Sequence, residues 1–255
     1  MTKKFDLQTA KEITPLSKSG NTITYAIPII GDLAEQVFEY ASSRINDFSD
    51  DPMFKDRYFQ LQETKDGKII TGSNPGLVIL CNDGLQEECE LWLPTISQAR
   101  ILDEQGKLSN NVYRDYGVAV YNDSDPNQEL AKHLIEQAKS RGYTNLPLLF
   151  SNCDLTLKGK SSQFKPELIQ SPIEILQGQE AEGVLKKMYQ GSSGARSVNR
   201  YGDGYWVAYW YYPGDSDSYG RVDYACGEAT CDELLKVVQE RAKNDFTKKL
   251  EALAA

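Results

Sequence analysis

Apolar residues recur every three or four positions in four segments of the chain, the spacing that places side chains on one face of a helix. The segments that predict helices are 32–45, 128–141, 180–189 and 231–253. Asp32 and Thr230 each precede a glutamate by three residues, as in a capping box. Asp125 is a predicted N-cap because Pro126 follows it at the first helical position. The last segment predicts a long C-terminal helix.

Between these helices the chain is rich in β-branched and aromatic residues, which favour strands. The predicted strands are 22–30, 58–63, 68–71, 77–81, 90–93, 112–121, 146–157, 205–212 and 220–226. Asp66 and Gly67 predict a hairpin turn, and a second hairpin would bring 220–226 back beside 205–212. Strands in succession with isolated helices between them are typical of an antiparallel arrangement. The predicted fold class is therefore α+β, a largely antiparallel twisted sheet with three or four packed helices.

One polar stretch interrupts this pattern after residue 157. It contains Gly159 and Pro166, and Ser171 with Pro172 follows shortly after it. The predicted organisation is a β-rich body over 1–157, a linker or surface loop over 158–172, and a smaller α+β part over 173–255. A single continuous domain with a long surface loop is the alternative that the sequence leaves open.

Charge and composition limit the classes of partner and the cellular compartment that we expect. The chain has 28 basic and 37 acidic residues, a net charge of −9, which opposes bulk attraction to nucleic acid or to anionic lipid. No apolar run approaches the roughly eighteen residues of a membrane span, and no apolar segment of a signal peptide follows Met1. The five cysteines are scattered and odd in number, which favours free thiols. We therefore expect a cytoplasmic protein, or one assembled there into a larger particle, without a membrane partner.

Complete catalytic motifs are missing from the sequence. The one histidine, His133, lies inside a predicted helix, where a Ser-His-Asp or Cys-His site is not expected. The Gly-Lys-Ser at 159–161 is not a phosphate loop, because Asp154 stands where that motif needs a glycine and Pro166 prevents the helix that should follow. The sequence therefore favours a non-catalytic protein and predicts no cofactor, apart from a divalent cation considered next.

Three aspartates near the end of the predicted second hairpin are candidate metal ligands. Asp215, Asp217 and Asp223 occupy the first, third and ninth positions of a calcium-binding loop. Gly220 fits the sixth position, but Cys226 stands at the twelfth, where a bidentate glutamate belongs. Solvated loop aspartates are the simpler interpretation, and a divalent-metal-dependent hydrolase is the alternative.

The most unusual segment is 201–224, which holds seven of the fifteen tyrosines and two of the three tryptophans. A strand over 205–212 would carry apolar or aromatic side chains on both faces, so both faces need a partner. The candidate binding residues are the aromatic ones of this strand and three neighbouring arginines: Tyr205, Trp206, Tyr209, Trp210, Tyr211, Tyr212, Arg196, Arg200 and Arg221.

Three interpretations of this aromatic segment compete. Helices and strands of the same chain would cover both faces, or part of the surface is a protein interface, to which Tyr and Trp are suited. In the third, the rings stack bases while the arginines contact phosphates. The favoured function is a non-catalytic binding or structural protein, a subunit of a protein assembly with a protein partner or with itself. A viral or mobile-element origin fits, and single-stranded nucleic-acid binding is the alternative.

Overall fold

A six-stranded sheet forms the centre of the protein. The structure is a computed structural model, which describes residues 25–47, 58–65, 67–83, 91–108, 110–151, 155–158, 165–168, 174–209, 214–226 and 232–254. In spatial order the sheet consists of β10 (Tyr189–Gln190), β12 (Trp206–Ala208), β11 (Ala195–Arg200), β5 (Arg114–Val120), β6 (Leu148–Ser151) and β9 (Glu174–Gln177). β10 and β12 are parallel, and the other neighbours are antiparallel. The predicted α+β class and the mostly antiparallel sheet are confirmed.

Helices cover both faces of this sheet. The described helices are α2 (Asp32–Asp47), α3 (Pro75–Asp83), α4 (Ile96–Glu104), α5 (Gln128–Ser140), α6 (Gly178–Leu185) and α7 (Asp232–Ala254). α3 and α5 pack on one face, called here the α5 face, where Val118 and Phe150 join the larger hydrophobic core. α4 and α6 pack on the other, the α4 face, where Ala119 and Leu149 join a second core.

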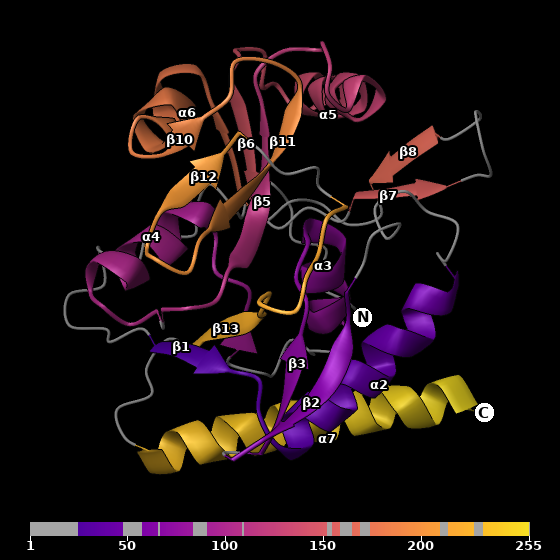
Figure 1. Ribbon diagram of the computed structural model, residues 1–255. Helices are drawn as coiled ribbons and strands as arrows, with labels where there is room; N and C mark the ends of the chain where they lie inside the picture. The colour runs from indigo at the N-terminus through magenta and orange to yellow at the C-terminus, as the bar shows by residue number, and fades with distance from the viewer. Residues whose placement is uncertain are drawn as a thin grey trace.

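A second layer of structure lies beyond one end of the sheet (Figure 1). It contains a three-stranded sheet of β1 (Tyr25–Pro28), β13 (Asp223–Cys226) and β4 (Leu91–Trp92), and the hairpin β2 (Gln60–Thr64) and β3 (Gly67–Thr71). α2 and α7 pack against each other along its outer side, where the ring of Tyr40 meets Phe246 at 5.5 Å between centroids. The predicted hairpin of 58–63 with 68–71 is confirmed by the pairing of β2 with β3.

The segment 77–81, predicted as a strand, is part of helix α3. Leu77, Val78, Ile79, Leu80 and Cys81 are all buried, so no polar face marks the helical period. The residues at the start of the helix indicate a helix, although the apolar run after them does not. The Asn74 side chain accepts a hydrogen bond from the amide of Leu77 at 2.8 Å, and Pro75 takes the first helical position.

The prediction of three or four helices was too low, since six are described. The other helix that the hydrophobic pattern misses is α4, which begins at a capping box. The Thr95 hydroxyl accepts from the amide of Gln98, and the Gln98 side chain accepts from the amide of Thr95, both at 3.1 Å. The predicted start of α5 was wrong as well. Its N-cap is Asn127, in a left-handed conformation with φ of 60°, and not Asp125.

The predicted hairpin of 205–212 with 220–226 was also wrong. β12 pairs with β11 and β10, whereas β13 pairs with β1 and β4 in the other sheet. The described residues just before β13 are held against the turn that precedes α3. The Gly72 amide donates to the Gly220 carbonyl at 2.9 Å, and a Cβ on Gly220 would lie 2.4 Å from the Ser73 nitrogen. Only a glycine allows this close approach.

Both sheets combine strands from before and after residue 158. β5 pairs with β11, and β1 pairs with β13. Within the predicted linker, Lys165–Leu168 forms β8, which pairs with β7 (Leu155–Lys158). The capping box predicted at Thr230 lies outside the described residues.

Candidate binding surface

Three tyrosines form a cluster at the β10 edge of the six-stranded sheet. Tyr205 and Tyr209 flank β12, and Tyr189 lies in β10 opposite Val207. The ring centroid of Tyr189 lies 5.7 Å from that of Tyr205 and 6.3 Å from that of Tyr209. Tyr189 is 57% exposed and Tyr205 is 53% exposed, while Tyr209 is half-buried. We call Tyr189, Tyr205 and Tyr209 the tyrosine cluster.

The alternate side chains of β12 point to the α4 face and anchor the strand. Trp206 is 5% exposed, and its indole Nε1 donates to Oδ2 of Asp103 at 2.7 Å. The Tyr116 ring stacks on the indole with centroids 5.2 Å apart, and the Arg100 guanidinium lies 5.2 Å from the centre of the indole ring. Trp206 therefore belongs to the core and fixes the strand beside the tyrosine cluster.

Arg200 and Arg221 are held by other parts of the chain, whereas Arg196 lies beside the cluster, since its Nε and the Cα of Tyr209 would each be 3.5 Å from a Cβ on Gly191. Arg200 is 3% exposed; its guanidinium contacts Asp103 through Nε at 2.7 Å and Asn110 through Nη2 at 3.0 Å. Arg196 lies opposite Ala119, on the α4 face of the sheet, and donates to the carbonyl of Ser193. Arg221 donates to the carbonyls of Ser218 and Gly220 in its own loop.

The remaining aromatic candidates, Trp210, Tyr211 and Tyr212, lie outside the described residues. Tyr189 was missed by sequence reasoning, because a two-residue strand leaves no periodic pattern. Tyr189 joins the cluster because β10 pairs in parallel with β12. In the sequence, β11 lies between these two strands.

The candidate metal ligands lie in two places, the loop before β13 and the first position of β13. Asp215 and Asp217 lie in the loop before β13, where Oδ1 of Asp217 accepts from the amide of Tyr219 at 2.7 Å. Asp223 begins β13, and its side chain is outside the described part of the structure. Among the described residues, no three His, Cys, Asp or Glu side chains converge in a geometry that could hold a metal ion.

The loop with Asp215 and Asp217 lies close to a buried carboxyl, that of Asp115 on β5. The pKa of Asp115 is raised to about 6, chiefly by burial and in smaller part by the negative charges of Asp217 and Asp215. Hydrogen bonds with Ser197 and Ser73 act in the opposite direction and lower this pKa. The carboxyl is 5% exposed, so its surroundings decide its charge.

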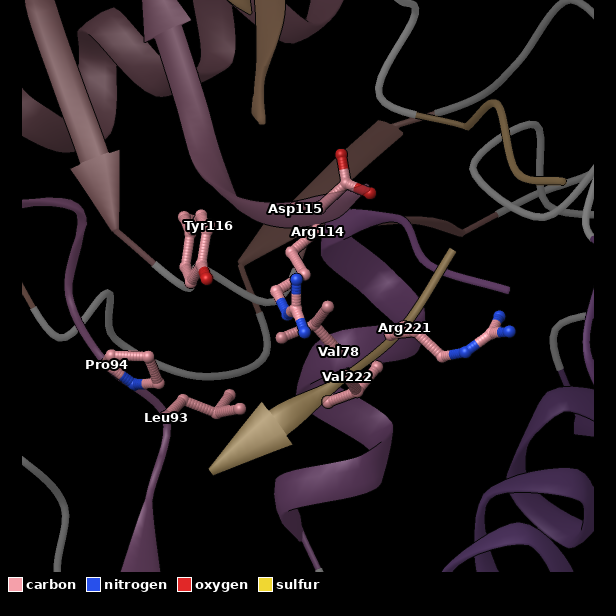
Figure 2. Close-up of a pocket in the computed structure, with 8 residues that line it drawn as sticks. All are labelled: Val78, Leu93, Pro94, Arg114, Asp115, Tyr116, Arg221 and Val222. Atoms are coloured by element: carbon pink, nitrogen blue, oxygen red, sulfur yellow. The ribbon is translucent and has the colours of Figure 1, made fainter. Parts of the chain in front are cut away.

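A small cavity lies between the six-stranded sheet and the three-stranded one (Figure 2). Its volume of about 10 Å³ is room for about one water molecule. It is lined by Val78, Leu93, Pro94, Arg114, Asp115, Tyr116, Arg221 and Val222. Figure 2 shows the Arg114 side chain extending toward Val78 while the Asp115 carboxylate points away from it. A cavity of this size does not hold a substrate, so the tyrosine cluster is the better candidate site.

Comparison with protein-family models, with curated proteins and with solved structures finds no match to this chain. No helix in the described ranges is both long and apolar enough to cross a membrane. The functional interpretation therefore depends on the geometry of the chain itself.

Proposed function

We propose that the protein is a non-catalytic binding protein, a subunit of a protein assembly, and that the tyrosine cluster is its contact surface. The observation that carries this proposal is the exposure of Tyr189 and Tyr205, whose rings contact each other while more than half of each side chain is open to solvent. Tyrosine is enriched at protein interfaces, because its ring buries a large area and its hydroxyl still finds a hydrogen-bond partner.

The strand beneath the cluster supports the proposal. Trp206 is held by Asp103 and Tyr116 on the opposite face, so β12 has a fixed position before any partner arrives. Tyr189 contacts both other rings of the cluster, which restricts all three side chains. A surface ordered in advance loses less conformational entropy on binding and therefore binds more tightly.

The partner that we propose is a second copy of the chain. β10 is the outermost strand of the sheet, so it lies at an edge where another chain can pair. The contact surface consists of aromatic rings, so the acidic side chains behind the net charge of −9 do not have to meet at the contact itself. Two copies related by a twofold axis would present the same tyrosines to each other, as in most homodimers.

The experiment compares the self-association of the wild type with that of a double variant, Tyr189→Ser with Tyr205→Ser, by sedimentation equilibrium. Because buried tyrosines at interfaces often contribute more than 1.4 kcal/mol, we expect the dissociation constant of the double variant to rise at least tenfold. The control is Tyr219→Ser, which removes a tyrosine that is 67% exposed on the loop before β13, outside the cluster. This control should associate as the wild type does.

Two results would contradict the proposal: unchanged association of the double variant, or a wild type that stays monomeric. In the second case the same variants should be titrated with single-stranded oligonucleotides at low salt, the alternative predicted from the sequence. That function has less support, because stacked bases need cations nearby and, of the three candidate arginines, Arg196 is the one beside the cluster. Arg200 is engaged with Asp103, and Arg221 donates to carbonyls of its own loop.

A further inference from the structure

The main chain of β10 presents one residue, Gln190, to the free edge of the six-stranded sheet. Within a strand that pairs in parallel, the N–H and C=O of one residue point to one side and those of the next residue point to the other. The Gly191 amide donates to the Ala208 carbonyl of β12 at 3.1 Å. Tyr189, two residues earlier, faces β12 in the same way. The N–H and C=O of Gln190 therefore point away from β12.

These two main-chain groups lie at an open edge. β10 is the outermost strand on its side of the sheet (Figure 1), and within the described ranges no other strand pairs with it there. Gln190 is exposed, and no hydrogen bond joins its main chain to a described residue on the outer side. An edge N–H and C=O that face water are a template for pairing with a strand of another chain.

The sequence around β10 lacks the devices that keep sheet edges apart. Proteins prevent edge-to-edge pairing with charged side chains and prolines on their edge strands, but residues 188–195 contain neither. The charged residues on either side are engaged within the chain: Lys187 with Glu104 at 3.7 Å, and Arg196 with the Ser193 carbonyl. In a chain of net charge −9, such an uncharged edge is where two copies approach with little repulsion.

We propose that two copies of the chain join by antiparallel pairing of their β10 strands, centred on Gln190, so that two six-stranded sheets become one continuous sheet. This inference rests on the proposed self-association through the tyrosine cluster and specifies its geometry. The twofold axis passes between the two Gln190 residues, perpendicular to the sheet. The Gln190 N–H of each copy donates to the Gln190 carbonyl of the other, which satisfies all four outward groups.

This geometry places both tyrosine clusters on the same face of the joined sheet. Tyr189 projects to the face that also carries Tyr205 and Tyr209, whose rings it contacts. In an antiparallel pair centred on Gln190, Tyr189 of one copy lies opposite Gly191 of the other. Gly191 has no side chain, so the Tyr189 ring has room to lie across the axis. The main-chain bonds then set the register, and the rings supply the buried area.

The first test removes the outward N–H with Gln190→Pro. Proline is tolerated on an edge strand where its nitrogen faces outward, so the pairing of β10 with β12 should survive. Both hydrogen bonds between the copies are lost, and we expect the dissociation constant in sedimentation equilibrium to rise at least tenfold. The matched control, Gln190→Ala, keeps the main chain and should associate as the wild type does. A folded Gln190→Pro variant that associates as the wild type does overturns the strand pairing.

The second test is disulfide cross-linking, which decides the matter if Gln190→Pro does not fold. Opposite residues of a hydrogen-bonded antiparallel pair have Cα atoms about 5.5 Å apart, within the range of a disulfide. Gln190→Cys should therefore form a covalent dimer under mild oxidation, above the level of the wild type. Ser192→Cys should not, because its two Cα atoms would be about 13 Å apart.

The outcomes separate this inference from the proposed function. A wild type that stays monomeric overturns both. Association that is lost in the Tyr189→Ser with Tyr205→Ser double variant, combined with no more covalent dimer from Gln190→Cys than from Ser192→Cys, overturns the strand pairing and leaves the tyrosine contact in place.

Discussion

Glu174 begins the outer strand β9, where its carboxylate is largely enclosed by protein. Its Oε2 accepts hydrogen bonds from the hydroxyls of Ser97 at 3.3 Å and Ser151 at 3.1 Å. Ser151 also accepts from the amide of Ile96, so the same hydroxyl joins β9 to the start of α4. Burial raises the pKa of Glu174 above its usual value, although the hydrogen bonds with Ser151 and Ser97 lower it. Folding therefore shifts the protonation equilibrium of this side chain toward the neutral form.

The variant Glu174→Gln tests this preference through the pH dependence of stability. A carboxyl whose pKa is raised by folding stabilises the protein below its unfolded pKa and loses that contribution as pH rises through the folded pKa. We expect Glu174→Gln to match the wild type in urea unfolding near about pH 4 and to be the more stable protein near about pH 8. The titration of Asp115 is common to both proteins and cancels in the difference. A variant that is less stable than the wild type near neutral pH would contradict the argument.

At the scale of elements, Asp103 connects helix α4 to two strands. Its Oδ1 accepts from Nε of Arg200 on β11, and its Oδ2 accepts from the indole of Trp206 on β12. Arg200 is 3% exposed, and its ion pair with Asp103 is 2.7 Å long, so Asp103 compensates a charge that is shielded from water. The tyrosine cluster is on the far side of the same strand β12. The position of the proposed binding surface thus depends on a carboxylate of the opposite face.

Replacing the Asp103 carboxylate should lower the free energy of unfolding. Asp103→Asn removes a carboxylate that pairs with the buried Arg200, and we expect a loss of about 3 kcal/mol in the free energy of unfolding. The matched control is Glu104→Gln on the same helix. Glu104 forms an exposed ion pair with Lys187 at 3.7 Å, and such pairs contribute about 0–1 kcal/mol. Urea unfolding of both variants measures the difference, and equal stabilities would contradict the role of Asp103.

Local signals predicted some of these elements and not others. The helix from Asp32 and the β2–β3 hairpin follow from a clear amphipathic period and an Asp-Gly turn. α3 could not be distinguished from a strand by period, because all of its central side chains are buried. Asn74 and Thr95 are residue types typical of helix N-caps. At α3, the cap at Asn74 indicates a helix although the apolar run that follows resembles a buried strand. For α3 and α4 the start of the helix is therefore a better predictor than its interior.

At the scale of the whole molecule, pairing between distant segments decides where the candidate sites lie. The aromatic pattern drew attention to Tyr205 and Tyr209, but Tyr189 joins them only through the parallel pair of β10 and β12. Sequence reasoning identified the segment that carries the proposed surface, and the sheet order supplied its remaining members.

The measurement that tests the central claim most directly is the mass of the untagged wild-type protein, by size-exclusion chromatography with in-line light scattering. At high salt we predict a discrete multiple of 28.6 kDa, because salt screens the repulsion between copies of net charge −9 and does not weaken contacts between aromatic rings. Dilution should shift the mass toward that of one chain, and the Tyr189→Ser with Tyr205→Ser double variant should shift at higher concentrations. A mass of 28.6 kDa at every concentration and salt would contradict the account of the tyrosine cluster as a contact between copies of this chain.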